Sequence, residues 1–504
     1  MGGENSIRIT NNPGDRFPTW SPDGRQIAFY RDSDDSTGIY TIPALGGTEH
    51  RIYKGPSNTW LDTSGLTWSR DGETIAFTEN DRDKIHCHIA LLSMSDFTTR
   101  PLTWPDDRHI DYLPAYSPNG QFIAFQRDNV AGTTGDIYIV PSRGGKPKPV
   151  THSFRNKIGL AWTPDGKEIV FSTGYESIGT GALWRVPLSG GTPAAIAGVG
   201  RGAIYPSIAR RAHRLVYENI ATKENLWRLN LSNEKRRRAS PTLLLSEAGK
   251  KMRPHFSPDG RRIAFESDRL GYWEIWACDA NGSNCAQLTS LHTLAGAPQW
   301  SPNGRYIAFE FHPTEQSEIY LLDVQTGQSR LLSTNPGFDN LAPSWSRDGK
   351  WLYFGSTRCA APLRFQLWKV PVAEGPPIQV TKNGGLQAFE SADGRVLYYT
   401  KYDVPGIWKI PVEGGDESLV FGDFDSTLFR NWVICERGIY LISFTTHPQG
   451  TIQFFEFYSR KLTTLWNLEK TAGWGVTLAP DGHSLVYVQK DFNEANLMLV
   501  ENFN

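Results

Sequence analysis

The residues best suited to chemistry in this chain are charged and polar side chains that precede the first strand of a recurring unit. They are Arg16, Asp62, His109, Asp111, Arg155, Lys157, Arg201, Arg253, Asn340 and Arg430. Loops held by a rigid scaffold often carry binding residues. A ring of such loops, with both signs of charge, could bind a peptide or a polar ligand. A solvated rim without a ligand is the alternative for any one of these residues.

Motifs that would indicate catalysis do not occur in the sequence. The chain lacks the G-x-S-x-G nucleophile elbow, the H-E-x-x-H zinc motif and the G-x-x-x-x-G-K-[ST] phosphate loop. His86, Cys87 and His88 could bind a soft metal, but no further ligand is spaced nearby, so ordinary strand positions are favoured. Turn geometry explains the many aspartates without Ca²⁺. We therefore expect no enzyme activity, no catalytic residue, no cofactor and no bound metal.

Five cysteines are present, without a C-x-x-C motif: Cys87, Cys278, Cys285, Cys359 and Cys435. Cys278 and Cys285 flank a six-residue turn and could face each other across a hairpin. They could form a disulfide in an oxidising compartment. Two free thiols are favoured, because the other three cysteines are scattered and odd in number.

A four-residue turn motif recurs along the chain and sets the positions of the candidate loops. Its clearest copies are Ser21-Pro22-Asp23-Gly24, Ser69-Arg70-Asp71-Gly72, Ser117-Pro118-Asn119-Gly120, Thr163-Pro164-Asp165-Gly166, Ser257-Pro258-Asp259-Gly260, Ser301-Pro302-Asn303-Gly304, Ser346-Arg347-Asp348-Gly349, Ser391-Ala392-Asp393-Gly394 and Ala479-Pro480-Asp481-Gly482. Degenerate copies lie near Ala209–Ala212 and Cys435–Gly438. Successive copies begin 44 to 48 residues apart, which is the length of one propeller blade.

Each unit contains the same series of short strands. An apolar residue, usually aromatic as in Trp68, precedes the turn, and a strand such as Ile75-Ala76-Phe77 follows it. A third strand such as Ile275-Trp276 and a short fourth strand such as Gln287-Leu288-Thr289 complete the unit. Strands that are apolar on both faces need a neighbouring sheet on each side, and radial stacking supplies both. The sequence therefore predicts an all-β fold of tandem β-propellers with four-stranded antiparallel blades, about eleven in total.

Eleven units exceed the usual size of one ring, so we expect two. The predicted division places five blades in residues 1–235, a ring that could be truncated from six, and six blades in residues 236–504. Residues Thr242–Ser246 could supply the fourth strand that the last unit lacks after its third strand, Asn496–Val500. The strand Ile7–Thr10 could close the first ring against the fifth unit, since it looks like an orphan fourth strand.

These repeats resemble the PD40, WD40-like repeats of TolB-type propellers, which also occur in tricorn-type proteases. The motif W-S-P-D-G-x-x-I-A-F, the I-Y or I-W strand and the closing L-T carry the resemblance over residues 5–504. The run Glu274–Thr289 and the last residues, Leu497–Phe503, look closest to the C-terminal sensor propellers of bacterial serine/threonine kinases and CadC-type winged-helix regulators. The resemblance implies ligand or partner sensing. Kinase motifs and a winged helix are absent, so neither activity is carried over.

Charge and hydropathy bound the partners and the compartment. The net charge is −1, from 52 basic and 53 acidic residues, so no global field recruits nucleic acid. The basic run Lys235–Arg238 is interpreted as a solvated linker. No apolar stretch is long enough for a membrane span, and the N-terminus lacks signal-peptide features. We expect a monomer with a protein or peptide partner, cytoplasmic as written, or periplasmic if the chain belongs to a membrane-anchored sensor.

Together these features favour a non-enzymatic sensor or scaffold that binds a protein, a peptide or another ligand. Two alternatives stay open. One is a detached sensor region of a kinase or a winged-helix transcriptional regulator. The other is the propeller portion of a hydrolase or peptidase system.

Overall fold

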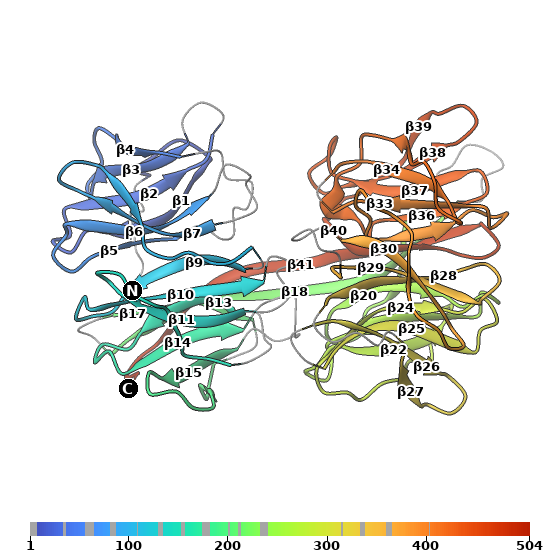
Figure 1. The fold of residues 1–504 in the computed structure, drawn as a ribbon, viewed down its shortest axis with the longest axis horizontal. Helices are drawn as coiled ribbons and strands as arrows, with labels where there is room; N and C mark the ends of the chain where they lie inside the picture. Colours follow the sequence, from blue (N-terminus) through green and yellow to red (C-terminus); the bar gives the residue numbers. More distant parts are fainter. Residues whose placement is uncertain are drawn as a thin grey trace. The chain divides into compact units, whose positions relative to one another are not determined.

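The computed structural model describes an all-β protein (Figure 1). It describes residues 8–33, 37–55, 65–80, 87–107, 109–129, 135–152, 157–173, 182–199, 202–209, 213–231, 240–313, 316–332, 338–358, 365–402 and 404–503. These residues form nine four-stranded antiparallel sheets and one sheet of five strands. The only helical element among them is the short 3-10 turn η2 (Ser426–Leu428). The predicted fold class, tandem propellers of four-stranded blades, is confirmed.

Contacts divide the chain into two compact units. Unit 1 comprises Met1–Tyr175, Gly181–Asn219 and Asn496–Asn504, and unit 2 comprises Glu176–Thr180 and Ile220–Ala495. By contacts, one boundary falls between residues 219 and 220, and the predicted division of the rings at 235/236 stays a prediction. The last nine residues belong to unit 1, although the predicted division assigns them to the second ring. The whole basic run at residues 235–238 that suggested the later boundary lies, with its flanks, outside the described residues.

In unit 1, four sheets follow one another along the chain. Their strands are β1 (Asp15–Trp20), β2 (Gln26–Arg31), β3 (Gly38–Pro43) and β4 (His50–Lys54); β5 (Leu66–Trp68), β6 (Thr74–Asn80), β7 (Cys87–Ser93) and β8 (Thr99–Pro101); β9 (His109–Tyr116), β10 (Phe122–Asn129), β11 (Gly135–Pro141) and β12 (Lys148–Pro149); and β13 (Lys157–Trp162), β14 (Glu168–Thr173), β15 (Leu183–Pro187) and β16 (Ala194–Ala195).

In unit 2, five sheets are built in the same order. Their strands are β20 (Lys251–Phe256), β21 (Arg262–Ser267), β22 (Glu274–Asp279) and β23 (Ala286–Gln287); β24 (Leu294–Trp300), β25 (Tyr306–His312), β26 (Glu318–Asp323) and β27 (Ser329–Leu331); β28 (Asn340–Trp345), β29 (Trp351–Ser356), β30 (Gln366–Pro371) and β31 (Ile378–Gln379); β32 (Ala388–Glu390), β33 (Val396–Thr400), β34 (Ile407–Pro411) and β35 (Ser418–Phe421); and β36 (Trp432–Cys435), β37 (Gly438–Ser443), β38 (Thr451–Glu456) and β39 (Leu462–Asn467).

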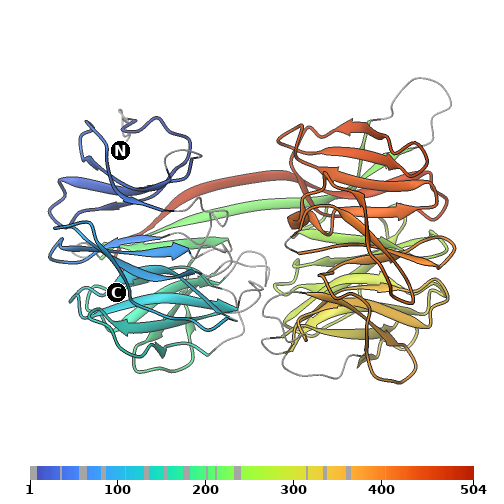
Figure 2. The same cartoon turned by 45° about the horizontal axis from the view of Figure 1, so that its top comes forward.

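The five-stranded sheet contains two unusually long strands. It runs in the order β17 (Ala203–Ile208), β18 (Leu215–Asn230), β41 (Ser484–Val500) and β40 (Ala472–Leu478), and β19 (Thr242–Leu245) pairs with β18. The unit boundary falls inside β18 and inside β41. In Figure 2, β18 and β41 are the long green and red ribbons.

The structure corrects one sequence expectation about this sheet and agrees with another. Residues 496–500 are not a separate third strand but the end of β41, because no Gly or Pro reverses the chain after Lys490. The segment Thr242–Ser246 does supply a fourth strand to the sheet of β40 and β41, as predicted: β19 pairs with residues 226–228 of β18, and β18 holds the third place. The sheet therefore takes its strands from two distant parts of the chain.

The recurring turn is held by its own side chains. In the first sheet of unit 2, Ser257 Oγ donates to Asp259 Oδ1 at 2.5 Å and accepts the backbone N–H of Arg262 at 2.9 Å. The N–H of Gly260 donates to the Ser257 carbonyl at 2.9 Å, and this glycine has φ +69°. A side chain is rarely tolerated at that φ, which explains the glycine at the last position of all nine clear copies of the motif.

The closing L-T pair also has a structural role. Thr289 Oγ1 accepts the backbone N–H of Ile275 at 2.9 Å and donates to Glu274 Oε2 at 2.5 Å. Thr381 makes the same pair of bonds with Leu367 and Gln366. The threonine therefore joins the fourth strand to the start of the third in each of these sheets.

Neighbouring sheets bury one another's apolar faces. Ala76, Ile89 and Leu91 of the second sheet pack against Ile123 and Phe125 of the third. Unit 2 also contains a cluster that joins its first sheet to the sheet of β40 and β41. The members of this cluster include Leu226, Leu245, Phe256, Phe265, Cys278, Val486 and Val488. We call this contact the closing seam of unit 2.

The first sheet of unit 1 leaves its tryptophan more exposed than the next sheet does. Trp20 is 59% exposed, whereas Trp68 at the same position of the next sheet is 6% exposed. Residues 8–10 form no strand, Ile7 lies outside the described part, and Ile9 packs against the cluster of Ile27, Phe29, Tyr40 and Ile42. Closure of this ring by Ile7–Thr10, and its number of blades, therefore stay predictions.

Candidate functional site

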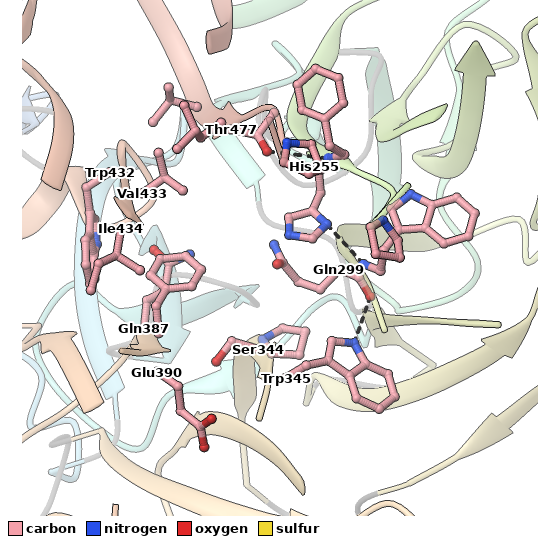
Figure 3. Close-up of a pocket in the computed structure, with 18 of the residues that line it drawn as sticks. His255, Gln299, Ser344, Trp345, Gln387, Glu390, Trp432, Val433, Ile434 and Thr477 are labelled. Carbon is pink, nitrogen blue, oxygen red and sulfur yellow. Dashed lines mark hydrogen bonds between the residues drawn. The ribbon is translucent and has the colours of Figure 1, made fainter. Parts of the chain in front are cut away.

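A cavity of about 560 Å³ lies within unit 2, lined by residues from all six of its innermost strands. These strands are β20, β24, β28, β32, β36 and β40, each the first strand of its sheet. The cavity volume falls within the range typical of ligand pockets. Figure 3 shows the side chains that surround it.

One register position in each strand faces this cavity: the residue just before the position of the blade aromatic. In strand order the six residues are His255, Gln299, Ser344, Phe389, Val433 and Thr477. Because successive side chains of a strand point to opposite faces, the aromatic faces one neighbouring sheet and the residue before it faces the other, where His255 bonds to Trp300. The ring is polar from Thr477 through His255 to Ser344, and apolar at Phe389 and Val433.

His255 is a neutral hydrogen-bonding group in this ring. Its Nδ1 accepts the backbone N–H of Trp300 at 3.1 Å, so the proton of the neutral imidazole resides on Nε2. Burial lowers the pKa of His255 to about 4. At neutral pH the side chain therefore offers an N–H donor rather than a positive charge.

Several buried polar atoms in the cavity wall have no hydrogen-bond partner among the described residues, and two of them are oxygens. The oxygens are Ser344 Oγ and Gln387 Oε1, in side chains that are 2% and 7% exposed as residues. A buried polar group without a partner costs about 1–3 kcal/mol. Both atoms belong to residues that line the cavity, so an occupant with donor groups could satisfy them.

Two arginines and two glutamates form the charged end of the cavity. Arg253 Nη1 lies 2.9 Å from Glu266 Oε2, and Arg430 Nη2 lies 2.7 Å from Glu310 Oε1. The same glutamates accept backbone N–H groups of the next sheet, from Ala297 to Glu266 and from Ala342 to Glu310. Each carboxylate thus links an arginine that lines the cavity to a backbone N–H of a neighbouring sheet.

Burial opposes ionisation of Glu310, but Arg430 and Arg253 outweigh it and hold the pKa of this carboxyl below its usual value. Burial and the neighbouring Arg253 lower the pKa of Arg430. A guanidinium nevertheless stays charged in proteins. Two positive and two negative charges therefore balance at this end of the cavity.

Gly475 allows the charged end to form. Its φ is +113°, and a Cβ added there would lie 2.6 Å from Arg253 Cα. A larger residue could not sit beside the backbone of β20 at this point. At its other end the cavity reaches the turns after the innermost strands, where Pro258, Pro302 and Pro480 line it.

The structure places the predicted rim residues in several different settings. Arg253 and Arg430 line the cavity, whereas Asn340 is fully buried and donates to Glu318 Oε2 at 3.1 Å. Asp62, Arg155 and Arg201 lie outside the described residues.

The four described candidates of unit 1 do not surround the unit 2 cavity. Asp111 is buried and pairs with Arg127 at 2.6 Å, and Lys157 is buried and lies 3.1 Å from Asp136. His109 Nδ1 lies 2.5 Å from Asp106, and Arg16 belongs to β1. Asp111, Lys157 and Asn340 thus make buried polar contacts in the described chain. Whether any predicted residue binds a ligand stays a prediction.

The sequence reasoning missed the ring of His255, Gln299 and Ser344. The predicted candidates precede the innermost strands or lie near their first residues, whereas these three residues lie near the C-terminal ends of the same strands. The signal that could have found them is register, because each precedes the recognisable aromatic position by one residue. Among the described residues no group of three or more His, Cys, Asp or Glu side chains could hold a metal ion. The described part also contains no helix with the length and apolar character to cross a membrane.

Comparison with known proteins finds one matching family model and two similar proteins. The TolB β-propeller domain family, PD40, matches residues 286–420. A TolB homolog of Chlorobaculum tepidum is 30% identical over 158 residues, which is 30% of this chain and 36% of that protein. The uncharacterized peptidase YuxL of Bacillus subtilis is 26% identical over 162 residues, 24% of each protein. The chain thus spans about a quarter to a third of the length of these relatives.

Solved structures similar to the chain include propeller proteins at low identity. The tricorn protease is 13% identical with a TM-score of 0.35, over 98% of this chain and 60% of that one. TolB from Acinetobacter baumannii is 14% identical with a TM-score of 0.22, over 69% of this chain and 80% of that one.

Proposed function

From the premise that this chain carries PD40 repeats of the TolB-like propeller family, we propose that it is a non-enzymatic binding module whose unit 2 cavity holds an uncharged segment of a protein partner. The observation that carries the proposal is the wall of the cavity. Unpartnered buried atoms of Ser344 and Gln387 lie in the same cavity as the apolar side chains of Phe389 and Val433. A peptide offers amide N–H and C=O groups together with aliphatic side chains, which match this wall.

Charge and aromatic exposure favour a peptide over other polar ligands. The arginines of the cavity are paired with glutamates, so they present no uncompensated charge to a phosphate. The indole rings of Trp300 and Trp432 are buried in the sheet interfaces, at 5% and 1% exposure, and cannot serve as stacking platforms for a sugar. A volume near 560 Å³ suits a few residues of extended chain.

Selection from a phage-displayed library of random linear peptides on the purified full chain tests the proposal. Titration calorimetry with a selected peptide would then compare the parent with Ser344→Phe, which fills the lumen, and Gln387→Glu, which adds a charge without adding volume. We expect each variant to weaken binding by at least about tenfold. The matched control is Ser207→Phe, because Ser207 holds the equivalent register position in β17 of unit 1.

Failure to select any peptide, or selected peptides that bind the parent and both cavity variants equally, would overturn the proposal. Thermal unfolding of each variant identifies a variant that has lost its fold. Gln387→Glu keeps the test decisive if Ser344→Phe does not fold, since it changes one functional group only.

The match to the peptidase YuxL favours a second candidate function, the propeller portion of a peptidase system. Labelling of the purified chain with a fluorophosphonate probe tests whether this chain itself carries an activated serine. We expect no labelling if the chain is a binding module. Specific labelling that depends on the folded state would favour the peptidase candidate. That the chain is a detached sensor region of a kinase or a winged-helix regulator stays a prediction. Its compartment and its oligomeric state also stay predictions.

A further inference from the structure

Two cysteines lie opposite each other in the outer hairpin of the first sheet of unit 2. The paired residues of β22 and β23 are Trp276 with Gln287 and Ala277 with Ala286. Cys278 and Cys285 continue the same register by one residue. The turn between them is closed by the N–H of Asp279 donating to the Ser283 carbonyl at 2.8 Å.

This register is suitable for a disulfide. Facing residues in antiparallel strands have Cα atoms about 4.5 or 5.5 Å apart and share one face of the sheet. Disulfides join Cα atoms about 4.4–6.8 Å apart, so either kind of pair meets the requirement. The two thiols are free and interact directly with each other.

The pair is located at the closing seam of unit 2. Cys278 is fully buried in the seam cluster, and Cys285 packs against that cluster from its edge. A Cβ added to Gly282 in the same turn would lie 2.2 Å from the Leu244 carbonyl of β19. Arg228 of β18 also donates to the Ala280 carbonyl. The hairpin thus contacts the sheet that completes the ring.

We propose that Cys278 and Cys285 are a dithiol modification site, which a small-molecule disulfide oxidises to an intramolecular bond across the closing seam hairpin. The thiolate of Cys285 attacks the disulfide, forms a mixed disulfide and releases one thiol of the reagent. Cys278 gives up its proton to solvent, and its sulfur displaces the second thiol from Cys285. Two cysteine thiols are oxidised and one reagent disulfide is reduced to two thiols.

Accessibility sets the order and the rate of these steps. Cys285 is partly exposed and Cys278 is not, so the reagent meets Cys285 first. Burial is the main cause that raises the pKa of both thiols, so the thiolate is scarce at neutral pH. We therefore expect slow oxidation that accelerates as pH rises.

The test uses the full chain, reduced and then incubated with oxidised glutathione at about pH 8.5, where thiolate is more abundant. Peptide mass mapping after alkylation of the remaining thiols would follow each cysteine. We expect a linked peptide containing Cys278 and Cys285, lighter by two hydrogens. The bond closes an eight-residue loop and should raise the unfolding temperature of unit 2 by roughly 5 °C.

Cys285→Ser should abolish both the linked peptide and the rise in unfolding temperature. The matched control Cys435→Ser should change neither, because Cys435 lies in β36, outside the seam cluster. Recovery of both cysteines as free thiols, or of Cys285 only as a glutathione adduct, would overturn the proposal. So would a bond that forms only after denaturation.

Discussion

The buried pair of Arg430 and Glu310 offers a quantitative test of the charged end of the cavity. The side chains are 7% and 4% exposed, and their atoms lie 2.7 Å apart. Removing one member of such a pair leaves an uncompensated buried charge and costs about 3–5 kcal/mol, whereas replacing both with neutral groups is often close to neutral. We expect Arg430→Met to destabilise unit 2 by about 3 kcal/mol at neutral pH. The double variant with Glu310→Gln should lose less than about half of that.

The pH dependence follows from the direction of the pKa shift. In the parent the pKa of Glu310 is below its usual value, so its contribution is present above the pKa of the unfolded chain and is lost as pH falls through the folded value. Without Arg430, burial dominates and the pKa of Glu310 moves above the unfolded value. The penalty of Arg430→Met is then largest near pH 8 and shrinks toward about pH 5, where Glu310 can be protonated.

Urea unfolding of the full chain at two pH values measures these costs, with hydrogen exchange to assign each transition to a unit. Arg305→Met is the matched control, because Arg305 pairs with Asp323 at 3.0 Å while half exposed and should lose less than about 1 kcal/mol. The reasoning is refuted if Arg430→Met costs less than the control, if its cost is the same at both pH values, or if the costs of the two single variants simply add.

Two further predictions concern the scaffold. Burial raises the pKa of Asp128 to about 7, although Tyr112 and Lys157 oppose the shift. The contribution of Asp128 to the free energy of unfolding is therefore complete below about pH 4 and is lost as pH rises to 7. Urea titrations should therefore find Asp128→Asn gaining on the parent by on the order of 3 kcal/mol between pH 5 and 8, and a constant difference would contradict this. Thr289→Val should cost about 2–3 kcal/mol in thermal unfolding, because it removes the bonds to Ile275 and Glu274, and Thr289→Ser should cost less than half as much. Equal losses for the two Thr289 variants would show that packing, not hydrogen bonding, is what the threonine contributes.

Local sequence patterns predict most of the fold. The turn that begins at Ser257, the strand after it and the closing threonine each specify their own geometry through contacts within a few residues or one hairpin. Alternation of side chains along a strand also places His255 on the opposite face from Phe256, so its position could have been inferred from the recognisable aromatic that follows it. The loops that enter the strands also contain buried residues such as Asn340 and Asp111, whose hydrogen bonds to neighbouring side chains cannot be inferred from the loop sequence alone.

The all-β repeat, its period and the resemblance to TolB-like propellers can be predicted from the residues, because they depend on short-range turn chemistry and strand alternation. The tertiary structure was needed to show that β18 and β41 run on as long strands of one sheet, because no local signal says which distant edge a strand will pair with. It alone brought Arg430 to Glu310, 120 residues away, and made one cavity of six strands. Such contacts depend on how sheets close into a ring, and that closure is a property of the whole unit rather than of any single repeat.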